Sequence, residues 1–168
     1  MSPLRRWLAL RTANPDSGEE MSAEVTGSLD GLQPKHARFL SAYAAVLARV
    51  AYIDREISPE ESEVMVRIIE RVDDISPKDA RLIVAIANEG ARRLGTRAGR
   101  EATQLFGAFA TRAQRVGLLR CLFAVAAAHE GVSGDELEEI EAIGRELGLG
   151  AAELETCRLE LQREPGTV

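Results

Sequence analysis

Four oxygen-bearing side chains alternate along one short segment, in a pattern that could bind a cation. They are Asp54, Glu56, Ser58 and Glu60. The oxygen ligands of a Ca²⁺ loop alternate in a similar way, but an EF-hand also needs Gly at its sixth position and an acidic residue at its twelfth. Counted from Asp54, those positions hold Pro59 and Met65. The segment is therefore not an EF-hand.

The same kind of segment occurs a second time in the chain. Residues 50–61 close one helical pattern and open another, and residues 125–136 do so again. Such an internal match indicates a duplicated structural unit. If the duplication brings the two polar corners together, Asp54 and Glu56 would meet His129 and Glu130. This mixed set of oxygen and nitrogen ligands suits Zn²⁺, Mn²⁺ or another transition metal better than Ca²⁺.

Local structure offers a competing interpretation of the neighbouring acids. Ser58 with Glu61, and Ser133 with Glu136, have the three-residue spacing of a helix capping box. Acidic residues in the first turn of a helix interact favourably with its dipole, which explains the acids beside them. Asp54, at the end of a helix, is the acid that local structure explains least. A solvated corner without a metal is the alternative to a metal site.

Apolar residues recur at helical spacing through most of the chain, and no long segment alternates with the period of a strand. We expect an all-α domain of about seven helices in a pseudo-two-fold bundle. The expected ranges are 35–54, a helix starting at 59, one from 77 toward 95, 99–110, 112–129, one starting at 134, and 151–162. Residues 34–164 would form this domain, and residues 1–33 a flexible N-terminal arm or linker.

Composition excludes several classes of protein. The chain has 168 residues, 45% of them hydrophobic, and a net charge of −6, which argues against a general nucleic-acid binder. No apolar run reaches the roughly 20 residues of a membrane span. The N-terminal segment 1–11 is basic and apolar but too interrupted for a secretory signal, although it could touch a membrane surface. Cys121 and Cys157 are expected to be reduced thiols, so we expect a cytoplasmic protein.

Charge is unevenly distributed along the chain. Seven arginines and one acid lie between Arg92 and Arg120, whereas eleven acids and three arginines lie between Glu130 and Glu164. These segments are either solvated helix faces or surfaces that attract a charged protein partner. No catalytic motif with a nucleophile, a phosphate-binding loop or a dinucleotide-binding glycine pattern is present, so we expect no enzyme and no catalytic residues.

The two corners resemble those of the tellurite-resistance TerB-like family, whose module also occurs in a membrane-anchored J-domain co-chaperone. Residues 51–61 resemble the family's A-x-A-D-G-E-I-x-x-x-E motif, and residues 126–136 its repeat partner. The resemblance covers roughly residues 35–162. It implies a seven-helix fold with internal pseudo-symmetry, an acidic divalent-metal site at the corners, and a stress-response role as a binding module.

This sequence departs from the family pattern at several corner positions. Arg55 replaces the Gly of the first corner, while Asp54 and Glu56 are retained. In the second corner, His129, Glu130 and Gly131 replace Asp, Gly and the second acid. Two functions therefore remain as alternatives. One is a metal-responsive stress module, and the other is a metal-free protein-interaction domain that could also contact a membrane peripherally through its N-terminal arm.

Overall fold

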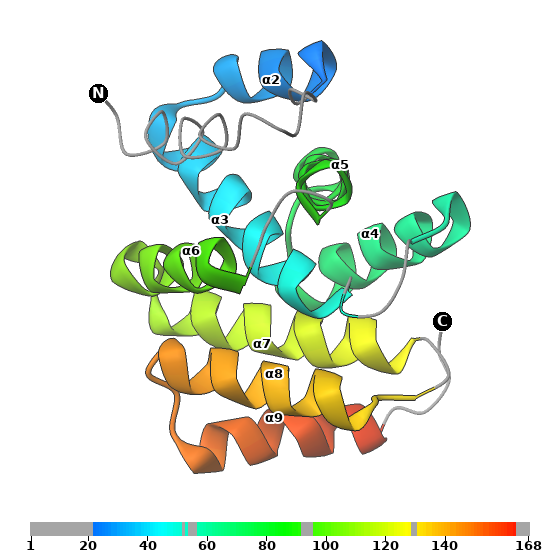
Figure 1. Ribbon diagram of the computed structural model, residues 1–168, viewed down its shortest axis with the longest axis vertical. Helices are drawn as coiled ribbons and strands as arrows, with labels where there is room; N and C mark the ends of the chain where they lie inside the picture. The colour runs from blue at the N-terminus through cyan, green and yellow to red at the C-terminus, as the bar shows by residue number, and fades with distance from the viewer. Residues whose placement is uncertain (1–21, 52, 54–56, 92–95, 129–130, 164–168) are drawn as a thin grey trace.

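The computed structural model describes residues 22–51, 53, 57–91, 96–128 and 131–163, and these are helices and short connections without strands (Figure 1). The helices are α2 (Ala23–Asp30), α3 (Pro34–Ala51), α4 (Pro59–Asp73), α5 (Pro77–Ala91), α6 (Thr96–Phe109), α7 (Arg112–Ala127), α8 (Gly134–Glu146) and α9 (Ala151–Arg163). The predicted all-α fold class is confirmed, with eight described helices in place of seven.

One packing relation recurs in the two halves of the domain: the first helix of each half packs on the third, α3 on α5 and α7 on α9. In the first half α3 packs on α5, with α4 also against α5, and in the second half α7 packs on α9 and α8. The halves meet where α4 packs on α7 and α3 packs on α8. In Figure 1, α7, α8 and α9 form a stack in the lower part of the molecule and α3 crosses above it. This arrangement agrees with the predicted internal repeat.

The core forms because each helix places its apolar stripe toward this junction. Its largest fully buried side chains come from α3, α4, α5, α6 and α7. They include Tyr43, Leu47, Met65, Ile69, Ile83, Phe106, Leu118 and Leu122. A second feature is an aromatic cluster between α3 and α6, in which the rings of Phe39 and Phe106 have centroids 5.5 Å apart. This cluster attaches α6 to α3 beside the repeat.

Helix α2 differs from the prediction of a flexible segment over residues 1–33. It is capped by Ser22, whose side chain accepts a hydrogen bond from the Val25 amide, and it buries Val25 and Leu29. The amide and hydroxyl of Ser22 also donate to the Glu89 carboxylate of α5, at 2.9 and 2.7 Å. Tertiary contacts with α5 therefore supply the order that the local sequence does not indicate.

Candidate functional site

The first corner lies between the end of α3 and the start of α4. The Ser58 hydroxyl accepts a hydrogen bond from the Glu61 amide at 3.2 Å, and the Glu61 carboxylate accepts one from the Ser58 amide at 2.7 Å. This is the predicted capping box, and Pro59 occupies the first helical position beside it. The Glu61 carboxylate thus caps the N-terminus of α4.

The second corner has the same construction at the start of α8. Ser133 and Glu136 form a complete capping box, with the reciprocal bonds at 3.2 and 2.9 Å. The corner turns through Gly131 at φ 96°, a left-handed conformation that glycine adopts without steric cost. Both predicted boxes are confirmed, so the duplicated sequence corresponds to a duplicated helix start.

The four predicted metal ligands, Asp54, Glu56, His129 and Glu130, lie outside the described residues. Among the residues that the structure does describe, no three His, Cys, Asp or Glu side chains are grouped closely enough to hold a metal ion. Glu60 and Asp135, in the first turns of α4 and α8, are exposed.

Two arginines of the basic segment pair with acids of α9. Arg112 contacts Glu153 at 2.6 Å and Arg120 contacts Glu160 at 2.7 Å. A hydrogen bond from the Gly150 amide lowers the pKa of Glu153, and the pair with Arg112 lowers it further. The two oppositely charged segments thus neutralise one another in part within the domain.

Arg115, in the same segment, has a structural role. Its guanidinium donates to the backbone carbonyls of Gly107, Ala110 and Leu147 at 2.6, 3.1 and 3.2 Å. These carbonyls lie at the C-terminal ends of α6 and α8, where intrahelical partners are lacking. Arg115 therefore joins two helix ends.

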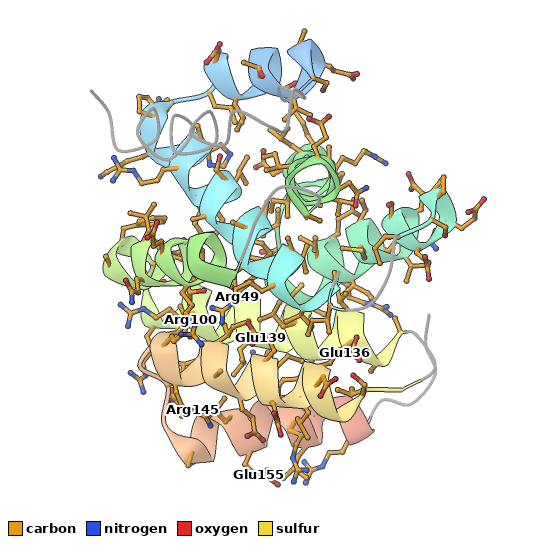
Figure 2. All side chains as sticks on the ribbon, in the orientation of Figure 1. Arg49, Arg100, Glu136, Glu139, Arg145 and Glu155 are labelled. Atoms are coloured by element: carbon orange, nitrogen blue, oxygen red, sulfur yellow. The ribbon has the colours of Figure 1, made fainter. Side chains whose placement is uncertain are left out.

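A nearly buried ion-pair cluster is centred on Arg49, near the end of α3. The side chain of Arg49 is only 7% exposed, and its guanidinium contacts Glu139 and Glu146 of α8, each at 2.6 Å. It also donates to the Thr103 hydroxyl of α6 at 2.6 Å. Figure 2 shows Arg49 directed toward Glu139 at the junction of these helices. The cluster ties the first half of the repeat to the second.

A second buried polar cluster lies at the far end of α4. Asp73 is the last residue of this helix, and Tyr43 of α3 and Cys121 of α7 are completely buried beside it. Burial raises the pKa of the Cys121 thiol to about 12, so the thiol is protonated at neutral pH and is no nucleophile. Burial likewise raises the pKa of Tyr43 well above its usual value.

Exposed cations mark the first turns of α3 and α5. The sequences Pro-Lys-His-Ala-Arg at 34–38 and Pro-Lys-Asp-Ala-Arg at 77–81 are near repeats, and the His36 ring contacts the Asp79 carboxylate at 3.0 Å. Lys35, Lys78 and Arg81 are exposed. None of the three forms an ion pair with a described residue. The near repeat indicates two similar helix starts, but the contact between them depends on the tertiary packing of α3 on α5.

Several of the described hydroxyl groups serve local helix structure. Ser58 and Ser133 accept capping hydrogen bonds, and Thr103 donates to the Gly99 carbonyl at 3.0 Å. The one described histidine, His36, contacts a carboxylate. These four polar side chains therefore stabilise helix starts, a helix turn and the contact between α3 and α5. None of the described helices has both the length and the apolar character needed to cross a membrane.

Comparison with known proteins identifies the family. Residues 40–159 match the family described as tellurite resistance protein TerB, and this range spans more than half of the chain. No curated protein and no solved structure matched the sequence. The matched range begins within α3 and ends within α9, so it includes both corners and the repeated packing. The chain belongs to the TerB family.

Proposed function

We propose that this protein is a non-enzymatic TerB-type binding module whose two helix corners hold a divalent metal ion, and that it takes part in a stress response to toxic ions such as tellurite. The observation that supports the proposal is the pair of complete capping boxes. Each box takes up its own glutamate, Glu61 or Glu136. A capping box is made by its serine and its glutamate alone, so neither helix start requires Asp54, Glu56, His129 or Glu130.

The chemistry of the remaining donors fits a metal ion. Asp54, Glu56 and Glu130 offer carboxylate oxygens and His129 an imidazole nitrogen, a set that favours Zn²⁺ or Mn²⁺ over Ca²⁺. A bound ion would supply positive charge that links the ends of helices from both halves. The surface that the two corners present to a protein partner would then differ between the metal-bound and the metal-free form.

Thermal unfolding with and without metal tests this proposal. An ion that binds only the folded protein stabilises it by about 2.7 kcal/mol at one hundred times its Kd, which is a rise of roughly 5–11 °C in Tm for a domain of this size. We expect the rise with Mn²⁺ or Zn²⁺ in the wild type and its loss in Asp54→Asn and His129→Gln. Asp135→Asn, an exposed acid in the first turn of α8, is the matched control. Equal Tm values with and without Mn²⁺, Zn²⁺ and Ca²⁺ would remove the metal from the proposal.

A metal-free interaction domain is the second candidate, and the unpaired cations at the starts of α3 and α5 favour it. In a chain of net charge −6, Lys35, Lys78 and Arg81 form a local positive surface that an acidic protein segment would complement. Replacing all three by Glu should abolish co-purification of partners from the native cell. The control is Arg112→Glu, whose parent side chain already pairs with Glu153. Partners retained by the triple variant would exclude this surface.

The cysteines bear on where the protein acts. Cys121 and Cys157 are both buried and free, as expected of thiols in a reducing compartment. These free thiols support a cytoplasmic location, which we propose for this protein. Fractionation of the native cell tests this location directly.

A further inference from the structure

Asp73 occupies an unusual position for a carboxylate, because it faces the interior where α4 meets α7. The space for it exists because residue 117 is Gly: a Cβ atom built there would overlap Asp73 Oδ1 and lie 2.7 Å from its Cγ. Asp73 is only partly exposed, and its Oδ2 atom is buried. The absence of a side chain at Gly117 thus allows Asp73 to lie against the backbone of α7.

The groups around Asp73 leave polar atoms unsatisfied. Asp73 Oδ2 and the Tyr43 hydroxyl are both buried, and neither makes a hydrogen bond of acceptable geometry. The hydroxyl nevertheless lies near enough to the carboxylate and to the Cys121 thiol to affect their ionisation. Buried polar atoms without partners are rare in folded proteins and destabilise them.

The electrostatic environment favours the neutral acid. Burial raises the pKa of Asp73 from 3.8 to about 6, and the nearby Tyr43 hydroxyl and Arg120 guanidinium act in the opposite direction. Tyr43 comes from α3, and Arg120 and Cys121 come from α7. No ionisable group of α5, which also packs on α4, is among those that shift this pKa. A protonated carboxyl carries no charge to desolvate and gains a donor that could serve a neighbouring oxygen.

We infer that Asp73 and the groups packed around it form a buried proton-binding joint between α3, α4 and α7. Asp73 lies in the space left by Gly117 with its Oδ2 atom buried and without a partner, and a proton taken up by this carboxyl in the folded domain would remove an uncompensated buried charge. The inference is independent of the proposed metal site, because Asp73 ends the helix that the first corner begins. It gives the domain a response to mildly acidic conditions that arises in its core.

The direction of the response follows from the linkage between proton binding and folding. Because the folded-state pKa is the higher one, the stabilisation by the proton is complete below pH 3.8 and is lost as the pH rises through about 6. Between pH 7 and pH 5 the folding equilibrium constant should therefore gain about tenfold from Asp73 alone. Glu153 and Glu155 have lowered pKa values and oppose this trend at low pH. The total pH dependence is consequently not diagnostic.

The first test measures the full wild-type chain and needs no substitution. Side-chain carboxyl ¹³C NMR should show Asp73 titrating with a midpoint near pH 6. A midpoint below about pH 4.5 would overturn the inference. Tyr43→Phe then tests the group of the joint that opposes proton uptake: its hydroxyl favours the ionised carboxylate and so lowers the pKa of Asp73, and its loss should move the midpoint upward. An unchanged midpoint in this variant would remove Tyr43 from the joint.

The second test separates the proton effect from the rest of the protein. Urea unfolding is compared at pH 5 and pH 7 for the wild type and for Asp73→Asn, whose amide resembles the protonated acid in shape and charge. We expect Asp73→Asn to be more stable than the wild type at pH 7. At pH 5 the ratio of the folding equilibrium constant of Asp73→Asn to that of the wild type should be about tenfold smaller than at pH 7. Asp74→Asn, which removes the adjacent exposed charge, should keep the wild-type pH dependence. Parallel pH dependence in the wild type and Asp73→Asn would refute the joint.

Discussion

The contact between Gly99 and Arg49 leads to a prediction in which the sign of one substitution depends on a second residue. A Cβ atom added at Gly99 of α6 would lie 2.7 Å from Cγ and 2.9 Å from Cδ of Arg49. These atoms are in the stem of a side chain whose head is held by Glu139, Glu146 and Thr103. The stem cannot move aside without disturbing those contacts.

Two effects of opposite sign decide the magnitude. Replacing Gly by Ala within a helix stabilises it by about 0.5–1 kcal/mol. Overpacking a buried contact costs typically 1–3 kcal/mol. Gly99→Ala should therefore destabilise the wild type, by about 1–2 kcal/mol net. In an Arg49→Ala background the obstructing stem is absent, and Gly99→Ala should stabilise by up to about 1 kcal/mol.

A double-mutant cycle measured by urea unfolding tests this reversal. The coupling energy between the two sites should be about 2–3 kcal/mol, at the upper end of the range for residues in contact. Arg49→Ala alone should cost about 2–4 kcal/mol, somewhat below the value for removing one member of a fully buried pair, because Glu139 and Glu146 are 29% and 25% exposed. If Gly99→Ala stabilises both backgrounds equally, the described packing of Arg49 on α6 is incorrect.

Three further predictions concern stability and reactivity. Leu122→Ala and Ile140→Ala, both at fully buried positions, should each cost about 2–5 kcal/mol in urea unfolding, and values near zero would contradict the described helix faces. Ser58→Ala and Ser133→Ala should each cost about 0.5–2 kcal/mol, with Ser→Gly nearer to wild type, because each removes the acceptor of a capping box. The Cys121 thiol, buried and with a pKa of about 12, should resist a thiol reagent in native protein and react on unfolding; rapid native reaction would contradict its burial.

Helix starts were predictable from the sequence because their signals are local. Ser58 and Ser133 each precede a glutamate by three residues, and the hydrogen bonds of both boxes depend on nothing farther away. Thr111 with Gln114 forms a third complete box that the same rule could have identified. Apolar spacing placed the helices between residues 34 and 163 to within a few residues, because each helix has one side in the core.

The missed features depend on contacts between distant parts of the chain. Helix α2 is short, contains Gly27, and is ordered by Ser22 contacting Glu89, 67 residues away. Arg49 and Glu146 are 97 residues apart in the chain, so no local pattern marks them as partners. In the sequence Asp73 similarly resembles an ordinary acid at a helix end, because its burial depends on the packing of α7 against α4. The metal ligands proposed at the corners stay a prediction.

The polar contacts that the sequence did not indicate constrain how any ligand at the corners could act. The first corner lies between the end of α3 and the start of α4, and both helices are attached to the second half, α3 by the ion pairs of Arg49 and α4 by its packing on α7. Separating the halves as intact hairpins would break up the Arg49 ion pairs with Glu139 and Glu146, and partial separation would leave buried charge unpaired at a cost of several kcal/mol. A corner ligand that supplies only a few kcal/mol of differential binding cannot offset that cost. We therefore expect a response at the corners to alter the surface of a joined domain and not to open it.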